Sequence, residues 1–154
     1  DNYRFIIIGD GVMKEHFKKI VEKRKIKNVH FKEPMSRDEL IKEYINSDIL
    51  FLHLNVLKAF ERSLPSKLFE YAVMGKPLVG GLSGYSKDFV LKNIPHGHIF
   101  NPGDTEGCIE CIKRATEQKV DQKDIETFIK NYSREKIMHS LSQKILQHTS
   151  INNN

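Results

Sequence analysis

Apolar and polar residues alternate in blocks along the chain, and these blocks predict strands followed by helices. Five short apolar runs are typical of buried parallel strands, and they lie near residues 3–8, 28–32, 48–54, 77–81 and 97–100. Between these runs apolar side chains repeat at helical spacing, and the chain is expected to be helical from Thr105 onward. Strands that alternate with helices over short connections predict an α/β fold with a doubly wound, Rossmann-like parallel sheet.

The first and third apolar runs carry further expectations. The run at 3–8 is almost continuously apolar, so it is expected to be buried on both faces, and Gly9-Asp10-Gly11 ends it. These glycines are interpreted as a tight turn, with Gly11 kept as a candidate ligand contact, because a dinucleotide fingerprint would need a third glycine at Lys14. In the run at 48–54, His53 is expected to be a core residue.

Local signals also mark helix ends. Ser36 and Glu39 have the spacing of a capping box, which predicts the start of a helix. Pro65 suits a first helical turn and Gly75 suits a helix end, so a helix is predicted over residues 65–74. The loop at 55–64 that leads into this helix is longer than usual, and such loops are often functional.

The helix predicted at 65–74 has one apolar face and one polar face. Leu68 and Ala72 belong to the apolar face, whereas Lys67 and Glu70 lie on the other. Helix N-termini bind anions, so a phosphate is expected at residues 65–67, with Glu70 placed to reach a sugar hydroxyl. Ligands of open parallel sheets bind beyond the carboxyl ends of the strands, and this segment lies at that edge.

Composition is that of one soluble globular domain. The chain has 154 residues, 39% hydrophobic and 29% charged, with no apolar run near the roughly 20 residues of a membrane span and no signal peptide. The domain is predicted over residues 1–149, with a disordered tail at 150–154. Cys108 and Cys111 share one face of a predicted helix and are interpreted as packed, reduced thiols, which points to the cytoplasm.

Charge and metal-ligating residues exclude two other classes of function. The formal net charge is +5, but the lysines are spread out without interleaved aromatic residues, so a nucleic-acid platform is not expected. A basic surface instead suits phosphate-bearing substrates and loose contact with an anionic membrane leaflet. His96 and His98 have no third ligand near them in the sequence, and no metal site is expected.

One motif identifies a family that the chain resembles. The sequence P-S-K-L-F-E-Y-A-x-x-G-K-P-L-V, followed by G-L-S-G-Y, resembles the C-terminal, donor-binding half of a GT-B glycosyltransferase of family 4, especially the bacterial enzymes of O-antigen and capsule synthesis. Further pieces in the family's order are F-I-I-I-G-D-G, N-V-H-F, S-D-I-L-F-L and I-F-N-P-G-D. The resemblance therefore covers most of the chain.

The resemblance implies a site for a nucleoside-diphosphate sugar, with UDP as the expected nucleotide. Glu70 matches the second acid of the family's Glu-x7-Glu motif, which binds the ribose, while Arg62 stands where the first acid would be. The segment Pro65-Ser66-Lys67 matches the backbone that approaches the diphosphate. The loop Glu33-Pro34-Met35 matches the one that holds the base. These enzymes retain the anomeric configuration and require neither a metal nor another cofactor.

The chain also departs from the family. The strand and loop that supply an Arg and a Lys to the diphosphate are missing, as is the N-terminal acceptor domain, so the sequence is expected to be a fragment that is inactive alone. A gap is then expected beside the strand at 3–8. The implied acceptor is a saccharide or a lipid-linked sugar, which the missing domain would bind in the cytoplasm or at the inner face of the membrane.

Two alternatives share the predicted sheet. A GT-B-type sugar-nucleotide epimerase would use a similar donor pocket, but no acid/base constellation of its own is evident. A non-enzymatic regulatory module would need a phosphoacceptor such as Asp10 beside a second acid, and that second acid is missing from the sequence.

Overall fold

The computed structural model describes residues 3–151 of the chain, with side chains through Gln143. It divides into two compact units, Asp1–Glu43 and Tyr44–Asn154, which are described separately below. The single donor-binding domain over residues 1–149 stays a prediction. The last helix reaches Ile151, and residues 152–154 of the predicted tail lie outside the described residues.

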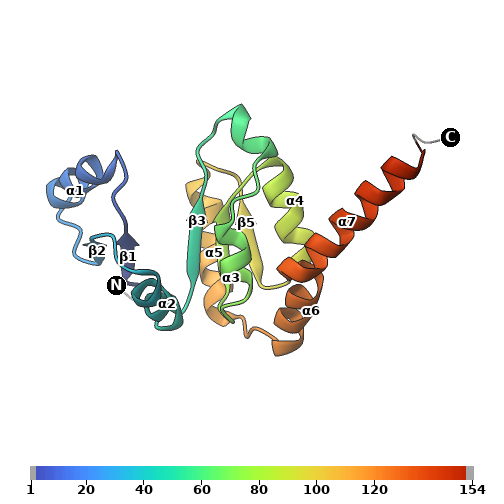
Figure 1. The fold of residues 1–154 in the computed structure, drawn as a ribbon. Coiled ribbons are helices and arrows are strands. Elements are labelled where there is room, and N and C mark those ends of the chain that lie inside the picture. The colour runs from blue at the N-terminus through green and yellow to red at the C-terminus, as the bar shows by residue number, and fades with distance from the viewer. Residues whose placement is uncertain (1–2, 152–154) are drawn as a thin grey trace. The chain divides into compact units, whose positions relative to one another are not determined.

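The first unit pairs two parallel strands. Its elements are β1 (Phe5–Ile8), α1 (Lys14–Lys23), β2 (Val29–Lys32) and most of α2 (Arg37–Ile45) (Figure 1). The strands are in register from Phe5 opposite Val29 to Ile8 opposite Lys32. The capping box before α2 is confirmed, because the Ser36 amide donates to Glu39 Oε2 at 2.9 Å and the Glu39 amide donates to Ser36 Oγ at 3.4 Å.

The second unit holds a three-stranded parallel sheet in the order β3-β4-β5. The strands are β3 (Leu50–His53), β4 (Leu78–Gly81) and β5 (Gly97–Phe100). All five predicted strands are therefore present, and the parallel, open sheets with helices confirm the predicted α/β class. Within the described residues β1 pairs with β2 alone, and the gap expected beside β1 stays a prediction.

Helices cover both faces of the three-stranded sheet. Phe100 and Val79 pack against α5 (Thr105–Glu117), whereas a Cβ at Gly97 would meet Val90 of α4 (Gly84–Asn93) at 2.4 Å. Gly97 lies opposite Leu78, the neighbour of Val79, and successive residues of a strand face opposite sides. Helices α4 and α5 therefore lie on opposite faces, with α3 (Lys67–Ala72) in front of the sheet in Figure 1 and α5 behind it.

The core beneath α5 contains the two cysteines. Cys111 and Ala115 are buried against Val79 and Phe100, and Cys108 packs against the same cluster. Both thiols are free, and burial raises the pKa of each. The interpretation of these cysteines as packed core residues is confirmed, and their raised pKa disfavours the reactive thiolate.

An aromatic cluster joins α3 and α4 to α6 (Gln122–Tyr132). Phe69, Phe89, Phe128 and Tyr132 lie with ring centroids 4.7–6.3 Å apart. The Tyr132 hydroxyl donates to Asn93 Oδ1 at 2.8 Å, so its polar end is satisfied inside the cluster. The last helix, α7 (Arg134–Ile151), follows, and within residues 3–151 no helix is both long and apolar enough to cross a membrane.

Two burial predictions are wrong. On β1, Phe5 and Ile7 are exposed, because burial alternates along this strand of a two-stranded sheet and these two residues lie on its uncovered face. On β3, Phe51 and His53 are exposed, since β3 is an edge strand and α5 packs on β4 and β5. The His53 ring instead lies 5.8 Å from that of Phe100 and over Gly81, where a Cβ would come within 2.3 Å of it.

His96 is predicted to make the fold sensitive to acid. It is 1% exposed, and neither ring nitrogen has a hydrogen-bond partner of good geometry. Burial lowers the pKa of His96, and this effect outweighs the charge of Asp124, which acts to raise it. In the unfolded chain the pKa of His96 is about 6.5. Below that pH the unfolded chain binds a proton that the folded chain does not, so the free energy of unfolding falls by up to about 1.4 kcal/mol per pH unit, whereas above it nothing is lost. Burial lowers the pKa of His98 too, in the same sense.

Urea unfolding between pH 7.5 and 5 checks this expectation. His96→Phe should flatten the loss of stability at acid pH, whereas the same change at exposed His139 should leave the wild-type slope in place. An unchanged slope in a folded His96→Phe variant would show that another group titrates.

Candidate functional site

A loop beyond the carboxyl end of β3 leads into α3. It contains a short 3-10 helix, η1 (Lys58–Arg62), between β3 and α3. A cavity of about 440 Å³ is lined there by Lys58, Ala59, Glu61 and Arg62. The predicted site residue Arg62 thus lies in a hollow beside one acid and one further cation.

The first turn of α4 holds this loop in place. Gly84 has φ +56°, and a Cβ there would lie 2.3 Å from the carbonyl oxygen of Glu61. The fully buried Ser86 donates its hydroxyl to the carbonyl oxygen of Ser63. The small residues that follow β4 therefore let the backbone of segment 61–63 pack closely against them. This contact holds the segment that carries Arg62.

Helix α3 is shorter than predicted. It spans Lys67–Ala72 rather than 65–74, because its last turn tightens into bonds from the Val73 amide to Glu70 and from the Met74 amide to Tyr71. Gly75, at φ +68°, then ends it as the sequence indicated. The six-residue helix carries a weaker terminal dipole than the predicted ten-residue one.

The backbone before α3 has free donors. Pro65 has no N–H and can donate nothing, so at that residue a phosphate would meet no backbone donor and could touch only the ring. The amides of Ser66 and Lys67 donate to no described backbone acceptor and to no side chain through Gln143, while the Pro65 and Ser66 carbonyls accept the bonds that start the helix. Two adjacent N–H groups therefore remain open to an anion.

Glu70 lies on α3 between a buried face and an exposed one. Leu68 and Ala72 are fully buried, Lys67 is exposed and Glu70 is half-buried. Neither charged residue forms an ion pair within the described residues. The predicted division of this helix into a packing face and a polar face is thus confirmed, and both charges are free for a ligand.

Two tyrosines beside Glu70 were not predicted. Tyr44 and Tyr71 are 6% and 7% exposed, and their rings meet edge to face at 5.1 Å. Burial raises the pKa of both hydroxyls, and the nearby Glu70 charge acts in the same direction. Tyr71 neighbours Glu70 in the sequence, but the apolar spacing gave no reason to place Tyr44 against it.

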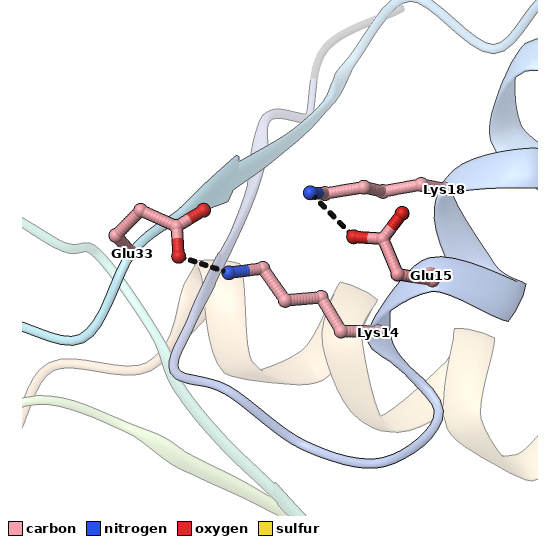
Figure 2. Close-up of polar contacts among 4 residues, drawn as sticks. All are labelled: Lys14, Glu15, Lys18 and Glu33. Atoms are coloured by element: carbon pink, nitrogen blue, oxygen red, sulfur yellow. Dashed lines mark hydrogen bonds and ion pairs between the residues drawn. The ribbon is translucent and has the colours of Figure 1, made fainter.

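The loop after β2 is tied to the start of α1. Lys14 Nζ lies 2.6 Å from Glu33 Oε2, as Figure 2 shows, and Lys14 is only 8% exposed. A second pair, Lys18 with Glu15 at 2.8 Å, lies within α1. The hydrogen bond and charge of Lys14 lower the pKa of Glu33. The predicted base loop therefore begins with an anchored carboxylate.

The glycines after β1 have different roles. Gly9 has φ +131° and needs to be glycine, whereas Gly11 has no positive φ and no atom within 4 Å of a Cβ placed there. The turn therefore depends on Gly9, and the space around Gly11 is open. No observation tests Gly11 as a ligand contact, which stays a prediction.

The structure groups the predicted residues into two sets. Gly11 and Glu33-Pro34-Met35 belong to the first unit, and Arg62, Pro65-Ser66-Lys67 and Glu70 belong to the second. Among the side chains that the structure describes, through Gln143, no group of three or more His, Cys, Asp or Glu is arranged to hold a metal ion.

Comparison with known proteins gives one match. The sequence model of the family described as "Glycosyl transferases group 1" matches residues 1–136. No curated protein and no solved structure matches the chain.

Proposed function

Because the chain belongs to the group 1 glycosyltransferases, we propose that it binds the nucleoside-diphosphate sugar donor of a retaining transfer, with UDP as the nucleotide. The observation that carries the proposal is the start of α3, where two open amides, an exposed lysine and an unpaired glutamate follow one another within five residues. Such a set offers donors to phosphate and a carboxylate to sugar hydroxyls.

Glu70 is the proposed ribose ligand. An ionised carboxylate accepts hydrogen bonds from two neighbouring hydroxyls, and among the described side chains, which end at Gln143, no ion pair competes for it. The packing of Tyr71 against Tyr44 fixes the turn of α3 that carries Glu70. The carboxylate is thereby held ready on a rigid element.

The diphosphate is proposed to lie against the start of α3. The amides of Ser66 and Lys67 donate to its oxygens, and Lys67 and Arg62 supply positive charge. In the transfer, the bond between the anomeric carbon and the phosphate oxygen breaks, and these groups stabilise the charge left on the departing diphosphate. The loop Glu33-Pro34-Met35 is proposed to hold the base.

The biological setting extends the proposal. The resemblance to family 4 enzymes of O-antigen and capsule synthesis suggests surface polysaccharide assembly, with a saccharide or lipid-linked acceptor in the cytoplasm or at the inner face of the membrane.

Lys67→Ala tests the phosphate part of the proposal. We expect UDP to bind the full-length protein in a salt-sensitive manner, and the substitution to weaken binding by roughly two- to fivefold, since an exposed charge contributes about 0.2–1 kcal/mol. The loss should shrink as salt rises from low to 0.5 M, because screening shortens the range of the charge to a few ångströms.

Calorimetry at three salt concentrations measures both effects. Lys130→Ala, an exposed lysine on α6, is the matched control and should bind like the wild type. Equal losses in the two variants would mean that overall charge, and not a phosphate site at α3, governs binding.

A further inference from the structure

The first unit contains one buried lysine. Lys14 opens α1 and is 8% exposed, although lysine is almost never buried without a partner. Its ammonium lies 2.6 Å from Glu33 Oε2, and Glu33 is its only hydrogen-bond or ion-pair partner in the described part of the chain. Figure 2 shows the side chain reaching from α1 to the start of the loop after β2.

The loop that Lys14 reaches has few other restraints. No backbone hydrogen bond joins residues 33, 34 or 35 to the rest of the described chain. The ladder ends with Gly9 donating to the Lys32 carbonyl, and helical bonding resumes at Ser36. The residues on either side of the loop are held, because Lys32 Nζ lies 2.6 Å from Glu43 Oε1 and the Ser36 amide donates to Glu39 Oε2. Within residues 33–35 themselves the Lys14–Glu33 pair is the side-chain tether in the described part of the chain, and the amides of Glu33 and Met35 donate to no described acceptor.

We propose that Lys14 is a positioning residue for nucleotide recognition: through Glu33 it fixes loop 33–35, and so determines which base the loop accepts. This inference rests on the proposed function, in which the loop holds the base. Backbone donors and acceptors distinguish bases only when they are held in one arrangement, because a loose loop can adapt its few polar groups to several base edges.

The second ion pair in Figure 2 supplies a matched control. Lys18 pairs with Glu15 within α1, three residues apart, and anchors no loop. Lys18→Met therefore removes a similar charge from the same helix without releasing residues 33–35. Glu33→Gln breaks the Lys14 pair from its exposed side, since the Glu33 side chain is 74% exposed, and this change leaves the buried stem of Lys14 intact.

The test measures Kd values of UDP, ADP, GDP and inorganic pyrophosphate for the full-length protein. Lys14→Met and Glu33→Gln should each reduce the ratio between the best and the worst nucleotide roughly tenfold, leaving the pyrophosphate Kd unchanged. Lys14→Arg should restore much of the ratio, and Lys18→Met should keep it. A merely structural role would weaken all four ligands together and lower the unfolding midpoint.

The outcomes separate this inference from its premise. If the wild type prefers one base and the ratio survives in both Lys14→Met and Glu33→Gln, the positioning role is wrong while the donor site stands. Equal loss of preference in Lys18→Met would also overturn it. If the wild type binds no nucleoside diphosphate, the proposed function fails and this inference fails with it.

Discussion

Glu70→Gln is expected to weaken the binding of a nucleoside diphosphate by roughly ten- to hundredfold while leaving the fold intact. Charged hydrogen bonds contribute about 1.5–3 kcal/mol, and an amide replaces one of two acceptor oxygens with a donor. Glu70 is half-buried and forms no ion pair with the side chains described through Gln143, so the change removes no internal ion pair seen there. Calorimetry with UDP measures the loss.

Stability and a second glutamate provide the controls for this experiment. Glu126 is exposed on α6, so Glu126→Gln should bind like the wild type. Thermal unfolding of Glu70→Gln should match that of the wild type within a degree or two. Unchanged affinity at unchanged stability would remove Glu70 from the ligand site.

Gly84→Ala should destabilise the second unit and disturb the loop at 61–63. An alanine at φ +56° costs about 1–2 kcal/mol, and its Cβ would overlap the Glu61 carbonyl oxygen at 2.3 Å, which adds about 1–3 kcal/mol. The overlap is with backbone, which cannot rotate aside. Urea unfolding measures the loss, and weaker UDP binding is expected because the segment carrying Arg62 must move.

Two other glycines separate the contributions to this loss. Gly103 has φ +88° but only Val56 Cγ2 at 4.0 Å from its Cβ position, so Gly103→Ala reports the backbone strain alone. Gly11→Ala has neither strain nor overlap and should be nearly neutral in stability. If Gly84→Ala costs no more than Gly103→Ala, the contact with Glu61 is not a rigid one.

Elements with a strong local signal could be predicted from the sequence. The strand at Leu78–Gly81 is buried on both faces and was recognised from its apolar run. The capping box at Ser36 and the stop at Gly75 were also predicted, because capping and positive φ depend on a few neighbouring residues. Such features need no knowledge of distant parts of the chain.

Burial depends on neighbours that the sequence does not reveal. His53 was expected in the core because it lies in an apolar run, but β3 is an edge strand and the imidazole is exposed. Phe5 and Ile7 are exposed for the related reason that β1 has a single paired strand. An apolar run predicts a strand, whereas its position within a sheet decides which faces are covered.

The family motif proposes the residues of the candidate site, but it does not predict their contacts. The motif points to Lys67 and Glu70, and neither forms an ion pair with the side chains described through Gln143. The tether between Lys14 and Glu33 spans 19 residues, and no local pattern indicates such a pair. An ion pair between residues far apart in the sequence can be identified only from the structure, because the fold brings the two side chains together.

The most direct test of donor binding is an NMR titration of the isotope-labelled protein with a panel of nucleoside diphosphates and their sugar conjugates. The account predicts that UDP and UDP-sugars shift the amide signals of Ser66, Lys67 and Glu70 and those of the loop at 33–35, saturably and at the same ligand concentration. Shifts confined to other residues, or none with any nucleotide in the panel, would contradict it.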